Sequence, residues 1–242
     1  MTTGIDEVAP GIYRLADFIP AVNRPAGLTF CEFLIDADEP MLFHCGHRAR
    51  FADLAEAVTR VMPLEKLRWV SYSHVEADES GALNEWLGAA PNATVAHGGI
   101  GANVWLRDYA LRPPRVLKDS ETMDLGGKRV RFIATPHLPH GWDSGLIHEE
   151  ITGTLFTSDL FAQGGDAPAL GNGDIVGPAT ALEDAIHATA LTPTTAPILR
   201  KLAELKPQRL ALMHGPTYTG DAAAGLEALA AHYEKTLRSA LA

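Results

Sequence analysis

The chain has 242 residues, of which 46% are hydrophobic and 21% charged, a balance that suits an ordinary globular protein with a full core. Its formal net charge of −10 argues against nucleic acid as a partner, because an acidic surface repels phosphate backbones. No apolar run is long enough to span a bilayer, and the stretch MTTGIDEVAP lacks the basic and apolar regions of a signal peptide, so we expect a cytoplasmic protein with no membrane partner.

Hydrophobic periodicity predicts short strands that alternate with helices. In chain order we expect a strand over 28–35, a helix over 51–62, a strand over 68–73, a helix over 79–87 opened by Asp78, and a short strand over 94–96. Next come a strand over 128–135, after a turn at Gly126-Gly127, and a hairpin of 146–147 with 154–157 around Thr152-Gly153. Residues 164–178, rich in Gly and Pro, are expected to form a long surface loop.

The C-terminal part continues the alternation. We expect a helix over 195–205, a buried strand over 209–213, and a last helix with the apolar stripe Leu226, Leu229, Tyr233, Leu237 and Leu241. The whole pattern predicts an α/β fold in which helices cover the outer faces of the sheets. No segment reads as a linker, so we expect residues 1–242 to form a single domain.

The two cysteines, Cys31 and Cys45, are too few for a disulfide framework and are expected to be reduced thiols. Cys45 lies in the run His44-Cys45-Gly46-His47, which has two interpretations. It could form part of a metal site, but a structural zinc site needs four ligands and no second pair lies nearby. A buried thiol beside a turn is the favoured interpretation.

Side chains that bind metals follow four of the predicted strands. His74, Glu76 and Asp78 follow RWVSYS, His140 follows KRVRFIAT, Asp159 follows TLFTS, and His214 follows RLALM. Sites assemble at the carboxyl ends of strands in α/β sheets, so we expect these six groups to converge. The alternative is that they are unrelated polar loop residues.

Imidazole and carboxylate donors suit first-row transition metals. Three carboxylates bring a formal charge of about −3, which is more than one divalent ion needs and which would be self-repelling without metal. Two metal ions are therefore the better match, and Asp159 could bridge them.

At this point the sequence resembles a known family. The runs SHVEADESGALNEWL, TPHLPHGWDS, LFTSDLF and MHG are similar to those of the metallo-β-lactamase superfamily, and most similar to the di-iron domain of flavodiiron proteins and oxygen-binding di-iron proteins. The resemblance implies the metallo-β-lactamase fold, an αββα sandwich. It also implies that His74, Glu76 and His140 bind one iron, that Asp78 and His214 bind the other, and that Asp159 bridges them.

Three features distinguish the chain from one or another of these relatives. Hydrolases of the superfamily usually read HxHxDH, whereas Glu76 stands at the second position here, as in the flavodiiron branch. The residue after Asp78 is often His and here is Glu79. Three roles are open to it: it could supply an oxygen ligand, contact the ligands without binding metal, or leave a metal position open to water. Flavodiiron proteins also carry a flavodoxin-like domain that this chain lacks room for. We therefore expect no bound flavin and a separate electron-donor protein, and a homodimer is typical of the family.

Replacing an imidazole by the Glu76 carboxylate makes the site harder and more anionic, which favours iron or manganese over zinc, although the general affinity order favours zinc. We expect iron, and a protein that binds or reduces O2 or NO. One alternative is a dinuclear hydrolase that uses a metal-activated water on an ester, lactone or thioester. Another is a sensor that binds O2 without turnover.

The residues near the ligands have competing interpretations. The aromatic residues Tyr72, Trp86, Trp142 and Phe161 could form a dry pocket wall or simply pack in the core. Asp143 and Ser144 could orient the His140 ring through hydrogen bonds or cap a turn. His137 is a rival to His140, which is preferred because His-x-x-Asp-Ser matches the family run. The histidines expected to be structural or on the surface are His44, His47, His97, His148, His187 and His232, of which His44 is the first to test because it follows the strand-like MLF.

Overall fold

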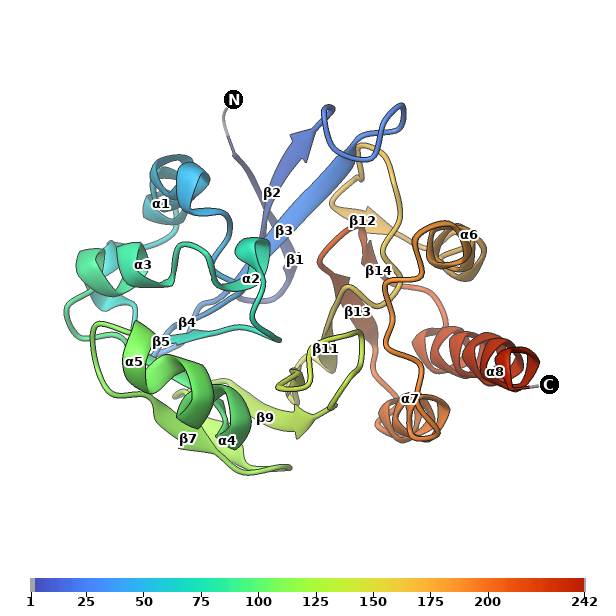
Figure 1. Cartoon of the computed structure of the whole chain (residues 1–242). Coiled ribbons are helices and arrows are strands. Elements are labelled where there is room, and N and C mark those ends of the chain that lie inside the picture. The colour runs from blue at the N-terminus through green and yellow to red at the C-terminus, as the bar shows by residue number, and fades with distance from the viewer. Residues whose placement is uncertain (1–2, 242) are drawn as a thin grey trace.

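The computed structural model describes residues 3–241 and arranges them as two β-sheets packed face to face (Figure 1). The first sheet has the order β1-β2-β3-β4-β5-β6-β7, with bounds Gly4–Ala9, Ile12–Ile19, Leu28–Ile35, Met41–Phe43, Trp69–Ser71, Thr94–Gly98 and Arg115–Leu117. The second has the order β12-β14-β13-β11-β10-β9-β8, with bounds Leu170–Gly171, Thr217–Tyr218, Arg209–Leu212, Thr154–Ser158, Gly145–Glu149, Arg129–Ala134 and Thr122–Asp124.

Helices cover the outer face of each sheet (Figure 1). The first sheet carries α1 (Phe51–Thr59), α2 (Ala77–Ser80), α3 (Leu83–Ala89), α4 (Gly99–Gly101) and α5 (Arg107–Tyr109), with short turns at Arg48–Arg50 and Leu64–Lys66 and a π-helical turn at Ala102–Leu106. The second carries α6 (Val176–Ile186), α7 (Thr195–Glu204) and α8 (Ala222–Ala240). This arrangement confirms the predicted αββα sandwich. None of the helices within residues 3–241 has the length and apolar character needed to cross a membrane.

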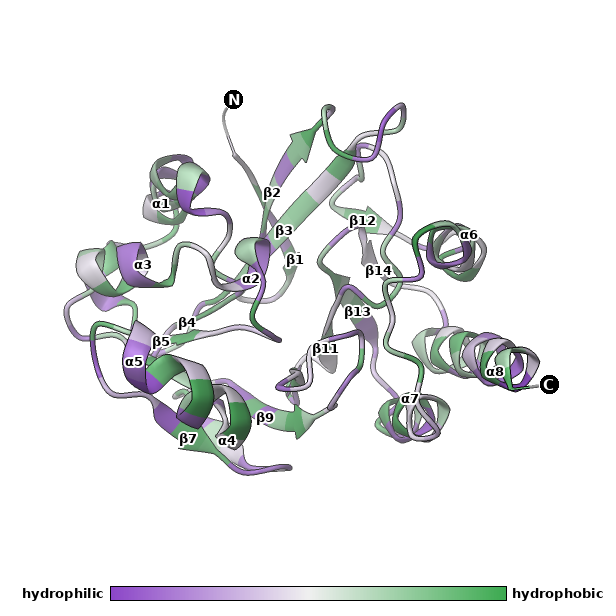
Figure 2. Ribbon diagram, viewed as in Figure 1, coloured by the Kyte–Doolittle hydropathy of each residue, from purple (hydrophilic) through white to green (hydrophobic). Residues whose placement is uncertain are grey.

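Alternation along the strands divides the core into layers. On β3, Phe33 and Ile35 face the second sheet, where Phe33 and Phe156 meet edge to face at 5.3 Å, while Leu34 faces the helices. Because both faces of β3 are covered, this strand is a mostly hydrophobic run. In contrast, α8 carries both hydrophobic and hydrophilic residues (Figure 2).

The predicted helix over 79–87 is wrong, because the chain forms two helices there, α2 and α3. The amide of Ala82 donates to the carbonyl of Gly46 at 2.9 Å, and the carbonyl of Glu79 accepts from the amide of Cys45 at 2.7 Å. These long-range hydrogen bonds take the place of hydrogen bonds within a helix, so the helix is interrupted between Ser80 and Leu83. Helix α2 begins at Ala77 with Glu76 as its N-cap, so Asp78 lies inside its first turn and does not precede the helix as predicted.

Two other expectations need correction. The segment 164–178 is not loop throughout: β12 pairs with β14 in parallel, and α6 begins at Val176. The stripe on α8 is buried at Leu226, Leu229 and Tyr233 but ends before Leu241, which is 79% exposed. Strands such as β1 and β7, which the periodicity did not reveal, depend on pairing with β2 and β6.

Candidate metal centre

Six predicted side chains meet where the two sheets face each other at one rim. His74, Glu76 and Asp78 follow β5 of the first sheet, and Asp78 is the one that lies within α2. The other three come from the second sheet: His140 from the loop between β9 and β10, Asp159 directly after β11, and His214 shortly after β13. The site therefore bridges the two halves of the sandwich.

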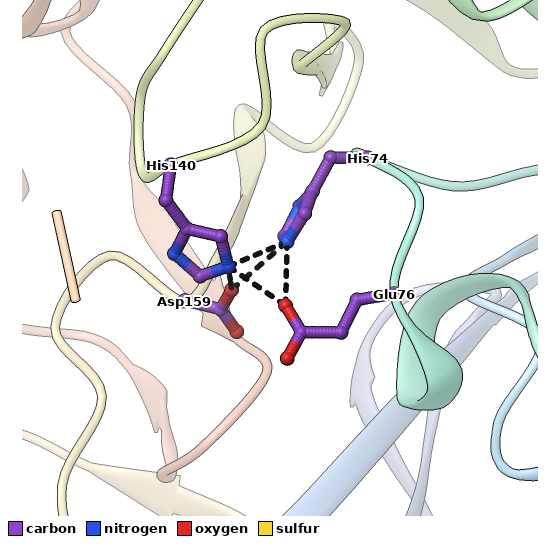
Figure 3. A group of neighbouring side chains, drawn as sticks. All are labelled: His74, Glu76, His140 and Asp159. Carbon is purple, nitrogen blue, oxygen red and sulfur yellow. Dashed lines mark hydrogen bonds and ion pairs between the residues drawn. The ribbon is translucent and has the colours of Figure 1, made fainter. Parts of the chain in front are cut away.

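Four of these side chains point at one another (Figure 3). His74 Nε2 lies 2.8 Å from His140 Nε2, and Glu76 Oε2 lies 3.1 Å from the first nitrogen and 2.7 Å from the second. Asp159 Oδ2 lies 3.5 Å from each of the two nitrogens. Four donor atoms at such mutual distances enclose a point that a cation could occupy.

The second group lies on the other side of Asp159. His214 Nε2 is 3.2 Å from Asp159 Oδ1 and 3.4 Å from Asp78 Oδ2. The two carboxylate oxygens of Asp159 thus face different groups of donors. Such a placement suits a carboxylate shared between two cations.

Hydrogen bonds behind the rings determine which nitrogen faces inward. His214 Nδ1 lies 2.9 Å from the carbonyl oxygen of Thr29, so this nitrogen donates and Nε2 is the ring atom that faces the site. His74 Nδ1 is bound to Ser73 Oγ at 2.9 Å, and this hydroxyl in turn lies 2.6 Å from Ser158 Oγ. The Ser73–Ser158 contact also ties the end of β5 to the end of β11.

The carboxylates at the site have shifted pKa values. Hydrogen bonds from His140 and His74 lower the pKa of Glu76 to about 2. Burial raises the pKa of Glu79 well above its usual range, and the neighbouring Asp159 and Asp78 charges raise it further. Glu79 is fully buried, and neither of its oxygens has a hydrogen-bond partner among the described residues.

The surroundings of Glu79 show whether these residues fit metal ions. A Glu79 oxygen lies within 4.8 Å of oxygens from Glu76 and Asp78. Glu79 Oε1 also lies 4.0 Å from His74 Nε2. A buried carboxylate is costly unless a positive charge compensates it, and a bound cation would supply that charge. Imidazole and carboxylate donors of this number fit first-row transition-metal ions.

The neighbouring residues lie in different places. Phe161 lines the cavity at the site, whereas Trp86 packs on Phe51 and donates to the carbonyl of Cys45, and Trp142 is 56% exposed. Tyr72 stacks on the buried His97 with ring centroids 4.5 Å apart. The expected wall of four aromatic residues is therefore wrong for the three besides Phe161.

Asp143 and Ser144 have partners other than the His140 ring: Asp143 faces His97 of β6, and Ser144 bonds within its own loop. Asp143 Oδ2 lies 3.6 Å from His97 Nε2, and Ser144 Oγ donates to the carbonyl of Leu138 at 2.8 Å. The rival His137 is exposed and lies outside the cluster, so the structure brings His140 to the site instead. His44 and His97 are both fully buried. His44 directly follows β4 and its ring nitrogens have no hydrogen-bond partner among the described residues, whereas His97 lies within β6 and faces Asp143.

A cavity of about 190 Å³ opens onto the cluster. One wall carries five of the clustered side chains, and the opposite wall comes from α6, the segment after it, and α8. The residues of this second wall include Ala179, Leu182, Glu183, Ile186, Thr189 and Tyr233. No local sequence pattern marks them, because Tyr233 belongs to an ordinary apolar stripe.

Comparisons with known proteins find a matching family model and several relatives. A sequence model described as ODP family beta lactamase matches residues 28–215. The chain is 32% identical over 141 residues to the putative diflavin flavoprotein A 1 of Nostoc sp., covering 56% of this chain and 24% of that protein. It is 29% identical over 210 residues to the coenzyme F420H2 oxidase of Methanothermobacter marburgensis, covering 80% of this chain and 51% of that protein. The chain thus spans about half or less of the length of these relatives.

Solved structures share the fold. Rubredoxin oxygen:oxidoreductase from Desulfovibrio gigas superposes with a TM-score of 0.81 at 19% identity, over 96% of this chain and 62% of that one. A fragment of the putative diflavin flavoprotein A 5 from Nostoc sp. gives a TM-score of 0.85 at 16% identity, over 100% of this chain and 99% of that one.

Proposed function

The chain belongs to the ODP family of beta lactamases, as its motifs predict, and from this premise we propose that it is a non-haem di-iron protein that binds or reduces O2 or NO. The observation that carries the proposal is the convergence of imidazole and carboxylate donors on both sides of Asp159. The names of the diflavin flavoprotein and of the oxygen oxidoreductase support it.

In this proposal the donors divide into two sets. His74, Glu76 and His140 would hold one ion, Asp78 and His214 would hold the other, and Asp159 would bridge them. Among the three roles open to Glu79, we propose that of an oxygen ligand, because its side chain is buried beside Glu76 and Asp78 and neither of its oxygens makes a hydrogen bond of good geometry among the described residues.

Four carboxylates beside three imidazoles form a hard, anionic donor set, which supports iron, with manganese next, over zinc. When bound, two irons would supply the one-electron redox chemistry that O2 binding or reduction needs. The donor chemistry also stabilises the more highly charged oxidised state. We propose that the electrons come from a separate donor protein.

The protein's own residues orient and shield the site. Thr29 fixes the His214 ring and Ser73 fixes the His74 ring, so that neither has to reorient when a ligand enters. Leu28 and Phe161 on the cavity wall limit the water that reaches the bound ligand.

The test is metal analysis of protein purified without oxygen, followed by optical spectra before and after O2 is added. We expect two irons per chain and a new absorption band on oxygenation. Zinc in place of iron, with an unchanged spectrum, would end the proposal. His140→Ala should lose metal, and His137→Ala, in the same loop but outside the cluster, is the matched control.

The same samples separate the alternatives. With a reductant present, repeated O2 consumption indicates an enzyme, whereas uptake of a single equivalent indicates a sensor. Hydrolysis of an ester, lactone or thioester that a chelator abolishes would indicate a hydrolase.

A further inference from the structure

The cavity wall opposite the metal-binding side chains is apolar except at one place. Ala179, Leu182 and Ile186 of α6 contribute its apolar part. The polar part consists of Glu183 from α6, Thr189 from the segment after it, and Tyr233 from α8. Thr189 contacts both of the other side chains, although Tyr233 lies 44 residues from it in the sequence.

Hydrogen bonds arrange the three as a chain with a defined direction. Thr189 Oγ1 donates to Glu183 Oε2 at 2.8 Å, and the Thr189 amide donates to Glu183 Oε1 at 3.0 Å. Because the only hydroxyl proton of Thr189 is used in this way, the contact of 3.1 Å between Thr189 Oγ1 and Tyr233 Oη needs Tyr233 as donor. The Tyr233 hydroxyl is therefore the end of the chain, with its own lone pairs left open.

The cavity places this end of the chain toward the metal centre. Tyr233 lines the same cavity as Asp159 and His214. Burial raises the pKa of Tyr233, and the carboxylates of Glu183 and Asp159 raise it further, so the hydroxyl keeps its proton at neutral pH. Glu183 at the other end is half-buried and can exchange protons with solvent.

We propose that when Glu183 binds a proton the chain reverses, with Glu183 donating to Thr189 and Thr189 donating to Tyr233. The Tyr233 hydroxyl is then free to donate a hydrogen bond, and during turnover a proton, to an oxygen-bearing or anionic ligand in the cavity. This inference rests on the proposed function and adds to it the route by which protons arrive. Tyr233 is the group that touches the ligand, while Thr189 and Glu183 are positioning residues.

The chemistry balances without consuming any residue. Reduction of one O2 to two waters breaks the O–O bond, forms four O–H bonds and uses four electrons and four protons. A one-electron carrier protein supplies the electrons, and solvent supplies the protons through Glu183. After each transfer Tyr233 takes the Thr189 proton, Thr189 takes that of Glu183, and both hydroxyls turn back to their starting direction.

A structural role alone would also explain the contacts, because the chain of hydrogen bonds fastens the end of α6 to α8. The two roles differ in what a substitution changes. A fastening role affects stability and leaves ligand affinity alone, whereas a donor role affects the affinity for an anion that accepts a hydrogen bond.

The first experiment titrates azide into iron-loaded protein and follows the optical spectrum. Tyr233→Phe should weaken azide binding about 10-fold, the value of one hydrogen bond to a charged group, with unchanged iron content. Tyr13→Phe, on the first sheet away from the cavity, should bind azide as the wild type does. Equal affinity in Tyr233→Phe and wild type would overturn the proposal.

The second experiment measures O2 consumption with a chemical reductant. Glu183→Gln and Thr189→Val should lower kcat about 10-fold or more, leave KM for O2 within about twofold, and leave azide affinity unchanged, because proton return alone is lost. Thr189→Ser keeps the hydroxyl and should restore kcat. A wild-type kcat in Thr189→Val, or no rescue by serine, would contradict the route through Thr189.

The two experiments also separate this inference from the function on which it rests. If the wild-type protein holds iron but consumes no O2, the proposed reduction fails, while azide affinity still decides whether Tyr233 is a donor. If O2 is consumed and the variants behave as wild type in both assays, the function stands and the proton route fails.

Discussion

At the scale of single residues, Asp159 occupies the point where the two groups of donors meet. Its Oδ2 faces His74 and His140, and its Oδ1 faces His214. Burial would raise the pKa of Asp159, but hydrogen bonding to His214 and the nearby histidines lowers it below the usual range. The side chain is therefore ready as an anion before any cation arrives.

Asp159→Ala should therefore lose both metal ions, because each group of donors is left without its shared ligand. Elemental analysis per chain, after dialysis against metal-free buffer, measures this. Asp166→Ala, an exposed acid in the same part of the chain, should keep two ions per chain. An Asp159→Ala protein that retained both would show that the ligand assignment is wrong.

Glu149 is an acid whose role is structural. Its side chain accepts from the Ile151 amide at 2.9 Å and from the Thr152 amide at 2.8 Å, and it anchors the turn between β10 and β11. Burial alone would raise the pKa of Glu149, but these hydrogen bonds outweigh burial and lower it. Its ionised form thus stabilises the fold above the unfolded pKa of about 4.3, and this contribution is lost as the pH falls through the lower folded pKa.

We therefore expect Glu149→Gln to reduce the free energy of unfolding at pH 7 by about 1–2 kcal/mol, with a smaller difference at about pH 3. Urea unfolding of chelator-treated proteins at both pH values tests this, because bound metal then contributes to neither free energy of unfolding. Glu204→Gln, at the exposed end of α7, is the control. A difference that grew toward low pH would have the wrong sign.

At the scale of elements, α8 depends both on a capping residue next to it in the sequence and on packing against distant elements. Asp221 precedes it, and its Oδ1 accepts from the Ala224 amide at 2.9 Å, which is the hydrogen bond of an N-cap. The buried side of the helix packs on α7 and the second sheet through Leu226, Leu229 and Tyr233. The start of the helix also determines where Tyr233 stands in the cavity.

Asp221→Ala should lower the free energy of unfolding by about 1 kcal/mol, because the amide of Ala224 loses its acceptor. Urea denaturation with unchanged slope would measure the loss. Asp221→Ser can still cap the helix and should recover most of it. If alanine and serine were equally destabilising, the cap would not be the cause.

At the scale of the whole molecule, the metal centre joins the two sheets at their common rim. The first sheet contributes His74, Glu76 and Asp78, and the second contributes His140, Asp159 and His214. Between the sheets, the apolar layer around Phe33 and Phe156 holds them together without metal. Ions bound at the rim would add to this layer only in the folded state.

Chelation should therefore lower the unfolding temperature by about 10 °C for each ion removed, because one ion at about 1,000 times its dissociation constant adds about 4 kcal/mol to a chain of this size. Calorimetry measures the shift, and hydrogen exchange should rise at the ends of β5 and β11 but not in β3. In Asp159→Ala the chelator should have no effect. A shift of the same size in that variant would place the stabilising ions elsewhere.

The sequence by itself determined the features that depend on local order. The apolar run over 28–35 predicted β3 with its observed bounds. The strands before Asp159 and His214 were found in the same way, because buried strands are continuous apolar runs. The identity of the donors at four strand ends was enough to predict that His74, His140, Asp159 and His214 would meet.

Only the tertiary structure decided the features that depend on residues far apart. The hydrogen bond from Ala82 to Gly46 divides one predicted helix into two, and packing against Phe51 takes Trp86 away from the site. The meeting of Glu183, Thr189 and Tyr233 depends on how α6 lies against α8. Periodicity reports which side of an element is apolar, whereas the partner of that side is determined by the register and packing of the whole chain.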